Sequence, residues 1–450
     1  MTRDDFRLEK TLIQYTPLLH FQGEEEGACL RPSEVKPMLD RFIVRYLDER
    51  GAEVPAGWKL DAPEGRTALR YKLHIRARGR AEQRVNEGTE QVNRETRKLE
   101  IKPSRDQDRN AKIHPMYFGA MGIDNYEEIA PHRWRSRIKS VMYRDGHTLT
   151  ILVMTKETVK LGDSELTLTQ LLDRLLPPFF AMHCFGTRSG KGFGSFGIKG
   201  ETVTPGMLAE YLPEGVPALY WVEYPDEPDE KVRLDDVNTL SMLMKSGFNY
   251  TGGNRNSSAY FKGMIIRYFL AQDIRSDKAA IKQFVLPGPE DDTEGSAPRR
   301  YHYVRGLLGT TQTYEFRDAV RRGKVDIAGT EIENKKPKIG RFGNPVHFKP
   351  HGSYLFLIPQ PIPGAIPGAE FEFSGYGGSV TLSIPDEKAF SLDAFLQYVA
   401  ETYQAELRDR NSNLYKLRTV PPSGPARSIA ATLKRVQAIN RAADPRKGES

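Results

Sequence analysis

Residues 167–198 read TLTQLLDRLLPPFFAMHCFGTRSGKGFGSFGI, and this stretch decides the fold that we expect. Leucines recur at three- and four-residue spacing in its first half, which predicts an amphipathic helix over 167–180. A loop rich in glycine follows, and the apolar residues at its end predict a short strand. The leucines are Leu168, Leu171, Leu172, Leu175 and Leu176, and the glycines are Gly186, Gly190, Gly192, Gly194 and Gly197.

The residues before this stretch predict a matching set of elements. An extended segment, an amphipathic helix, an alternating strand and a hairpin with an Asp145-Gly146 turn precede the glycine loop. Their order is β, α, a β-hairpin region, α, β, which is the split βαβ pattern of a ferredoxin-like module. The expected ranges are 6–21, 32–47, 68–78, and the hairpin strands 138–142 and 149–154.

The second half has a similar coarse layout. We therefore predict an α+β protein with two ferredoxin-like (RRM-type, βαββαβ) modules, enlarged by insertions, and a helical C-terminus. Residues 1–200 form the first module with the glycine-rich loop, and residues 218–450 form the second, with helical insertions and a basic tail. The expected elements are strands 219–224, 302–308, 346–359 and 371–384, and helices 236–245, 258–284, 391–407 and 427–442.

Positive charge gathers in one part of the chain. The net charge is +7, and residues 66–112 contain 14 Lys and Arg but only 7 Asp and Glu. In strand 68–78 every second residue is basic, so one face of the strand carries Arg70, Lys72, His74, Arg76 and Arg78. Clustered basic side chains are typical of nucleic-acid binding. A solvated charged face is the alternative.

The glycine loop suggests a contact with phosphate. Glycines let a backbone approach a ligand closely, Arg188 and Lys191 supply charge, and Phe193 and Phe196 are candidates to stack on bases. The spacing does not fit a P-loop. A G-x-G-x-x-G match begins at Gly192, but it leads from a helix into a strand, the reverse of a dinucleotide-binding motif. A glycine turn without a ligand remains the alternative.

The glycine loop resembles that of the RAMP superfamily, the RNA-binding proteins of CRISPR-Cas systems. Segments 16–18 and 30–42 are similar to the family's first strand and helix, and segments 305–309 and 341–346 are similar to its C-terminal module. The combination most resembles the first subunit of the type III-B (Cmr) effector complex. Residues 79–135 and 255–300 depart from that pattern as insertions, as do Pro37 and Asp40 within the helix.

The resemblance implies a subunit that binds single-stranded RNA, guide or target, without cutting it, and that docks to other Cas subunits in antiviral defence. With the basic strand Arg70–Arg78 included, the expected RNA-binding residues are Arg31, Lys36, Arg70, Lys72, His74, Arg76, Arg78, Gly186, Arg188, Lys191, Gly192, Phe193 and Gly194.

Two other functions stay open. Some relatives cut precursor RNA without a metal, by general acid–base catalysis with a histidine. His20, after the first strand, is the candidate here, and His183 is the second. The other possibility is a protein-interaction scaffold whose basic strand is merely solvated.

We expect no cofactor and no metal. His347 and His351 lie four residues apart, about 13 Å along a strand, which is too far for one ion. Two cysteines, Cys29 and Cys184, make neither a disulfide framework nor a zinc site. The chain has no apolar run of the roughly 18 residues that a membrane helix needs and no apolar N-terminal leader, so we expect a cytoplasmic protein.

Overall fold

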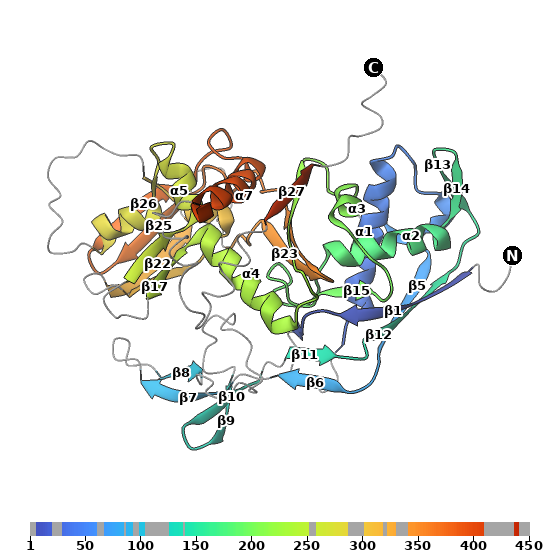
Figure 1. Ribbon diagram of the computed structural model, residues 1–450, viewed down its shortest axis with the longest axis horizontal. Helices are drawn as coiled ribbons and strands as arrows, with labels where there is room; N and C mark the ends of the chain where they lie inside the picture. The colour runs from blue at the N-terminus through green and yellow to red at the C-terminus, as the bar shows by residue number, and fades with distance from the viewer. Residues whose placement is uncertain are drawn as a thin grey trace.

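The computed structural model describes the parts of the chain given at the end of this paragraph (Figure 1). It is a mixed α/β structure in which nearly all strand pairs are antiparallel. A long helix, α7 (Leu392–Arg408), lies near the C-terminus. The expected α+β class and helical C-terminus are therefore confirmed. The described residues are 6–19, 29–60, 67–84, 87–92, 99–103, 126–137, 140–251, 258–286, 301–317, 322–329, 341–408 and 436–440.

The N-terminal half is built on a four-stranded sheet of order β15-β1-β12-β5. All three strand pairs are antiparallel. Helix α1 follows the first strand in the chain, and helix α2 follows the third. The strands are β1 (Arg7–Gln14), β5 (Tyr71–Ala77), β12 (His147–Val153) and β15 (Phe196–Ile198), and the helices are α1 (Pro32–Asp48) and α2 (Leu168–Met182).

Both helices pack against one face of this sheet. The apolar stripe of α1, including Leu39 and Ile43, and the leucines of α2 join the inward side chains of the strands in one buried cluster. Thr167 begins α2 with a capping box, because its side chain accepts from the backbone of Gln170, whose side chain accepts from the Thr167 backbone. The opposite face of the sheet carries the alternate residues of the strands, most of which are polar; Ile13 and Leu152 are the apolar ones among the described residues.

The expected hairpin at Asp145-Gly146 is instead a kink in a long ribbon. Strand β11 (Ser140–Tyr143) pairs with β6 (Ala81–Arg84), and β12 pairs with β5, in one continuous register. Gly146 has φ +74°, and a Cβ there would lie 2.0 Å from the carbonyl oxygen of Leu12. The glycine therefore allows a close backbone approach where the ribbon bends, rather than a chain reversal.

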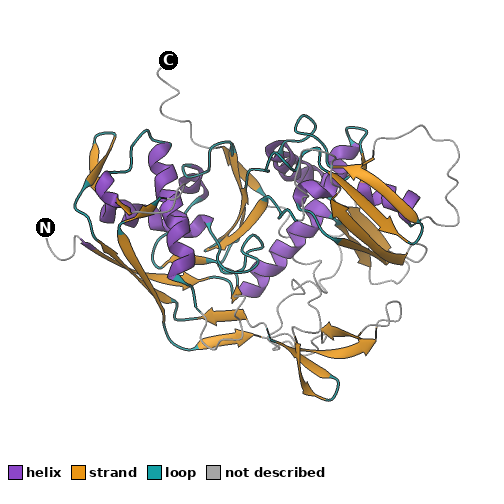
Figure 2. Cartoon of the chain, turned by 180° about the vertical axis from the view of Figure 1, so that it is seen from behind, coloured by secondary structure: helices purple, strands orange, loops and turns teal. Residues whose placement is uncertain are grey.

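The ribbon leads outward to a second, smaller sheet of order β8-β7-β10-β9. Both views show it projecting from the rest of the molecule (Figures 1 and 2). This sheet lies within the segment expected as an insertion. Its strands are β7 (Glu87–Val92), β8 (Leu99–Pro103), β9 (Tyr126–Ala130) and β10 (Arg133–Ser136); the smaller elements of this half are β2 (Leu18–Leu19), β3 (Lys59–Leu60), β4 (Ala68–Leu69), β13 (Thr158–Leu161), β14 (Ser164–Thr167), α3 (Pro205–Ala209) and the 3-10 turn η2 (Ala56–Trp58).

The C-terminal half repeats the four-stranded plan. Its sheet has the order β23-β24-β16-β27, again antiparallel throughout. Helix α4 follows the first strand in the chain, and α7 precedes the last. The elements are β16 (Ala218–Glu223), α4 (Glu230–Lys245), β23 (Val346–His351), β24 (Tyr354–Pro359) and β27 (Gln437–Asn440).

Two insertions enlarge this half with another antiparallel sheet, of order β21-β22-β25-β26. Short helices and strand pairs accompany it (Figure 2). The added elements are β17 (Gly247–Thr251), β18 (Ser258–Lys262), α5 (Met264–Leu270), β19 (Arg275–Ser276), α6 (Asp277–Ala280), the π-turn η4 (Ile281–Val285), β20 (Tyr301–His302), the 3-10 turn η5 (Val304–Leu308), β21 (Thr313–Arg317), β22 (Arg322–Gly329), β25 (Glu370–Gly375) and β26 (Gly378–Ser383).

Several expected elements of this half were wrong. The predicted helix 258–284 begins with a strand and contains only short helical pieces, and the predicted strand 302–308 is mostly a 3-10 turn. Residues 346–359 and 371–384 are two separate hairpins in different sheets rather than a strand pair. The predicted basic helix 427–442 is a strand at Gln437–Asn440, where it completes the sheet beside β16; the rest of that range lies outside the described residues.

The two halves share their buried cores. Tyr220 and Val222 of β16 belong to the C-terminal cluster, whereas Leu219 and Trp221 of the same strand belong to the N-terminal cluster. Strand β16 is therefore covered on both faces, and helix α3 of the N-terminal half packs against it. The central strands β16 and β24 of the C-terminal sheet therefore lie between the two buried cores.

Candidate nucleic-acid interface

The basic residues of β5 lie on the open face of the N-terminal sheet. Tyr71 and Leu73 point into the core, while Arg70, Lys72, His74, Arg76 and Arg78 are all exposed. The expected alternation is thus confirmed. A strand alternates its side chains between its two faces, so these five residues form one row along the sheet.

The neighbouring strands continue this face with hydroxyl groups. Thr148 and Thr150 of β12 stand opposite Arg76 and His74, and Thr11 of β1 stands opposite Thr148. The only described carboxylate in these rows of β1, β12 and β5 belongs to Glu9, and it is bound by Arg7 at 2.6 Å. The face therefore offers hydrogen-bonding groups and net positive charge.

A cleft of about 480 Å³ lies at one end of the row. Thr11, Arg78, Arg144 and Lys199 line it. The charge of Arg144 is paired within the protein, because its guanidinium donates two hydrogen bonds of 2.8 and 3.1 Å to Glu230 at the start of α4. The cations that this cleft presents on the sheet side are Arg78 and Lys199. Lys199 was not predicted, and its place beside Thr11 depends on the pairing of β15 with β1.

The glycine loop joins the two halves of the molecule. The carbonyl of Gly190 accepts a hydrogen bond from the Phe348 amide at 3.2 Å, and Ser195 donates to the carbonyl of Pro350. Glycine is needed at Gly194, where φ is +65° and a Cβ would lie 1.9 Å from the carbonyl oxygen of Phe185. The loop is thus packed between the N-terminal helices and strand β23.

The loop amides do not form the expected phosphate cradle. The amide of Gly186 donates to Glu34 at 2.5 Å, that of Thr187 to Leu19, and that of Gly194 to Pro17. The amides of Lys191 and Gly192 donate to carbonyls within the loop, of Arg188 and Ser189. These five donors are satisfied inside the protein, which argues against a phosphate contact by these amides.

The aromatic residues of the loop are also placed differently from the prediction. Phe193 and Phe196 are both 0% exposed, and each belongs to a buried cluster. Neither ring can stack on a base, so this part of the prediction was wrong. Phe193 packs in the C-terminal cluster, because glycines on either side let the chain pass close to β23 and α4.

Arg188 and Lys191 remain the charged candidates of the loop. Lys191 is exposed, and Arg188 is half-buried with φ +62°. Desolvation, together with the charge of Arg188, lowers the pKa of Lys191. Two cations that repel each other at a surface are suited to share an anion.

The two residues at the start of α1 differ in availability. Lys36 donates to Asp40 at 2.7 Å and to the carbonyl of Leu69 at 2.9 Å, and its ammonium lies 4.2 Å from the centre of the Tyr71 ring. It ties α1 to the sheet, which argues against an RNA contact. Arg31 precedes α1 and is half-buried.

The four histidines considered for catalysis (His20 and His183) or for a metal ion (His347 and His351) lie in different settings. His20 lies outside the described residues. Burial lowers the pKa of His183 to about 4, which makes it a weak base. Its Nδ1 lies 2.8 Å from the carbonyl oxygen of Phe179. His347 lies beside Gly190, whereas His351 is buried against the Tyr15 ring, 5.0 Å between centres.

Within the part of the chain that the structure describes, no three His, Cys, Asp or Glu residues are grouped so that they could hold a metal ion. Neither Cys29 nor Cys184 forms a disulfide. Among the same residues, no helix has the length and apolar character to cross a membrane.

The polar groups at the junction of the halves were not predicted from the sequence. Lys349 of β23 is 1% exposed and donates to the carbonyls of His183 at 2.8 Å and Phe196 at 3.0 Å. Burial lowers its pKa to about 8. Arg233 of α4 donates to the carbonyl of Gly352 at 2.7 Å and lies 5.0 Å from the centre of the Tyr15 ring. Nothing in the local pattern marks Lys349, because both carbonyls that it bonds lie more than a hundred residues away. Arg233 also bonds the nearby Glu227 and Pro228, and it reaches the N-terminal half at the Tyr15 ring.

Family models identify the chain. Residues 5–248 match the model of the Cmr1 N-terminal domain, and residues 260–422 match that of the Cmr1 C-terminal domain. The chain is therefore a CRISPR-associated protein of the RAMP superfamily, as its motifs indicated. Within that class it belongs to the Cmr1 family.

The likeness to a solved structure is more distant. The chain is similar to one chain in the cryo-EM structure of the type III-B Cmr-β complex bound to cognate target RNA and AMPPnP, in the presence of single-stranded DNA. The identity is 11% and the TM-score 0.33, and the match covers 79% of this chain and 94% of the other. No curated protein matches the chain.

Proposed function

We propose that this chain is an RNA-binding subunit of a type III CRISPR-Cas effector ribonucleoprotein, that it holds guide or target RNA without cutting it, and that it docks to other Cas subunits. Membership of the Cmr1 family supports the assembly. The observation that carries the RNA-binding role is the row of five exposed basic residues on the open face of the N-terminal sheet.

The fold within this proposal is a pair of ferredoxin-like modules, residues 1–200 and 218–450. The two sheets support it, because β15-β1-β12-β5 and β23-β24-β16-β27 have the same order when their strands are numbered along the chain. In each sheet a helix follows the first strand and another precedes the last, which is the split βαβ arrangement. The remaining strands are then insertions into this frame.

The two sheets differ in what they can offer to RNA. RNA-binding modules of this type use the face of the sheet that lacks helices. In the C-terminal sheet that face carries Trp221 and Phe356, which are packed against the N-terminal half. In the N-terminal sheet it carries the basic row and the threonines. We therefore place the RNA on the N-terminal sheet.

The chemistry of this face suits a single strand of RNA. Lys72, Arg76 and Arg78 are spaced four and two residues apart, so their side chains point to the same face of the sheet. They can neutralise successive phosphates of one RNA strand. Thr148 and Thr150 offer hydroxyl groups that can donate to or accept from a ribose 2′-hydroxyl, the group that distinguishes RNA from DNA. Contacts of this kind hold a backbone and read no sequence.

Arg188 and Lys191 of the glycine loop are a second proposed contact. They lie at the junction of the halves, where β23 approaches the loop.

The test is a binding assay of the isolated chain with labelled single-stranded RNA and matched DNA, without divalent metal, over a range of salt concentrations. We expect RNA to bind, to remain intact, and to bind more weakly as salt rises. A triple variant, Lys72→Ala, Arg76→Ala and Arg78→Ala, should reduce the slope of log affinity against log salt by about 2, since each lost phosphate contact on a single strand contributes about 0.7.

The matched control removes the same charge elsewhere. Lys160, Lys262 and Lys388 are exposed, and none of them lies in a strand of the N-terminal sheet: Lys160 is in β13, Lys262 is in β18 and Lys388 precedes α7. Their triple replacement by alanine should leave the salt slope within a few tenths of the wild-type value. Equal salt slopes for the two triple variants would refute the placement of RNA on the sheet. Cleavage of the RNA would instead support the alternative function, a processing endoribonuclease with His20 as its candidate catalytic residue.

A further inference from the structure

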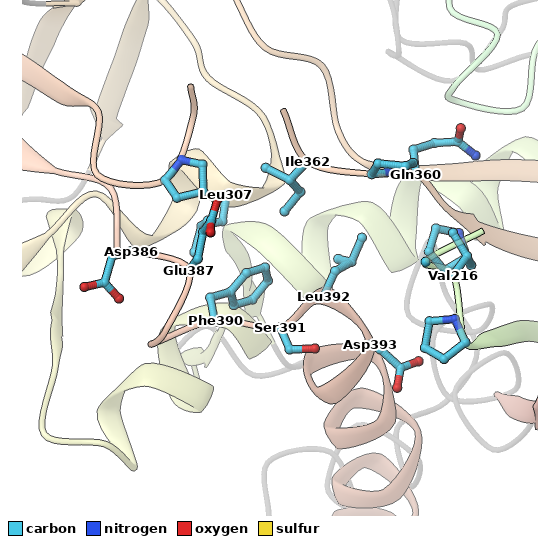
Figure 3. Close-up of a pocket in the computed structure, with 15 residues that line it drawn as sticks. Val216, Leu307, Gln360, Ile362, Asp386, Glu387, Phe390, Ser391, Leu392 and Asp393 are labelled. Carbon is cyan, nitrogen blue, oxygen red and sulfur yellow. The ribbon is translucent and has the colours of Figure 1, made fainter. Parts of the chain in front are cut away.

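A groove of about 310 Å³ lies on the C-terminal half, far along the chain from the basic row. Three segments form it: the connection 215–217 between the halves, the chain after β24 at 359–362, and the segment 386–393 that leads into α7 (Figure 3). Its volume is at the lower end of the usual range for ligand pockets, about 300–1,000 Å³. It can accept a short segment of chain with one anchoring side chain.

The floor of the groove is apolar and firmly held. Leu307 and Phe390 are 1% and 8% exposed, whereas Ile362 and Leu392 are half-buried and pack on the same core cluster. Figure 3 shows these four side chains grouped in the middle of the groove. An apolar floor that is only partly covered gains free energy when an apolar side chain is placed on it.

The walls are rich in proline, and this decides what the groove can bond to. Pro217, Pro359, Pro361 and Pro367 line it. Proline fixes its own φ and has no backbone N–H, so these positions offer carbonyl acceptors and no donors. The groove therefore keeps its shape without a ligand and favours a ligand that supplies donors.

The charges around the groove point to the same ligand. Asp386, Glu387 and Asp393 line it, and none of its described lining residues is Lys or Arg. Asp386 and Asp393 are fixed in place: Asp386 accepts from the amides of Lys388 and Ala389, and Asp393 accepts from the Tyr220 hydroxyl at 2.8 Å. In a chain of net charge +7, this is a negative site that repels nucleic acid and attracts a cation.

We infer that this groove docks a segment of a neighbouring protein subunit in which a lysine or arginine stands beside an apolar side chain. The apolar side chain rests on Ile362 and Leu392, and the cation meets the carboxylate of Glu387. Interfaces often depend on one such anchor in a preformed pocket. The inference rests on the proposed function, because it requires that the chain works within an assembly.

The test uses the full chain, co-expressed with the other subunits of its own complex and with guide RNA. Glu387→Lys reverses the charge at the groove, and Glu372→Lys makes the same change at an exposed position of β25. We expect Glu387→Lys to raise the rate at which the chain leaves the complex by about tenfold, and Glu372→Lys to leave it unchanged. Both variants should bind isolated RNA like the wild type and unfold at its temperature.

A crosslink identifies the occupant. A benzophenone amino acid in place of Gln360, which lines the groove but takes no part in the proposed contact, should give an adduct with another subunit, at a peptide that contains Lys or Arg next to an apolar residue. An adduct with RNA or with a second copy of this chain, the absence of any adduct, or equal release rates for the two charge reversals would each overturn the inference. A wild-type chain that joins no complex would overturn the proposed function as well.

Discussion

The two four-stranded sheets have the same strand order but opposite surroundings. In the N-terminal sheet, the face away from the helices carries Lys72, His74 and Arg76 and is exposed. In the C-terminal sheet, the corresponding face carries Trp221 and Phe356 and is buried against the N-terminal half. The open face of the N-terminal sheet is thus accessible to a ligand, whereas the corresponding face of the C-terminal sheet holds the two halves together.

The largest expected effect is on stability, and it should differ between the buried face of one sheet and the open face of the other. Trp221 is 9% exposed in the shared core, so Trp221→Ala should lower the free energy of unfolding by about 3–5 kcal/mol. Leu152, on the open face of the N-terminal sheet, is 38% exposed, and Leu152→Ala should cost less than about 1 kcal/mol. Urea unfolding measures both. Similar losses would mean that the two faces are not different in kind.

The second prediction concerns pH and the junction of the halves. Burial lowers the pKa of Lys349 to about 8. The unfolded chain therefore holds this proton over a range, from about pH 8 to 10.4, in which the folded chain has lost it. Stability contributed by Lys349 should rise with pH in this window, by up to roughly 3 kcal/mol, and should be lost as the pH falls through 8.

The matched variant is Lys349→Met, which keeps most of the side-chain volume. Urea unfolding between pH 7.5 and 10 should show a smaller rise in stability for this variant than for the wild type. Lys245, whose pKa burial lowers to about 7, contributes a similar rise in both proteins across this whole range, so the difference between the two profiles isolates Lys349. Identical pH profiles would show that the Lys349 amine does not titrate as a buried group.

The smallest expected effect concerns the ion pair between the halves. Arg144 and Glu230 form two hydrogen bonds, but the Arg144 side chain is 46% exposed, so solvent weakens the pair. Arg144→Ala should cost about 1–2 kcal/mol of stability. The exchange Arg144→Glu with Glu230→Arg should recover part of this loss, as a double-mutant cycle measures. A loss equal to the sum of the single changes would exclude a direct coupling.

The comparison also explains which features the sequence could predict. The alternation in Arg70–Arg78 predicted an exposed basic face because it depends only on neighbours in one strand. In β16, the run Ala218–Val222 has no polar position, the pattern of a strand buried on both faces, and this signal was available. The local pattern could not show what covers β16. It is covered by helix α3 and the N-terminal core, through contacts between residues that are distant along the chain.

The errors arose where distant contacts decide the structure. Phe193 stands between glycines beside two cations, a local setting that suggests stacking on a base, but β23 and α4 enclose it. Asp145-Gly146 is a local turn signal, yet the pairing of β11 with β6 makes it a kink. Lys349 and Arg233 could not be recognised, because a buried cation is defined by partners that only the folded chain supplies.

The central claim is that RNA lies on the N-terminal sheet and not on the C-terminal one. Single-stranded RNA with 4-thiouridine at successive positions, crosslinked to the isolated chain and mapped by mass spectrometry, tests it most directly. We predict adducts in residues 71–78 and 147–153. Adducts confined to residues 218–223 or 346–359 would contradict the claim, because they would require the buried sheet to be the open one.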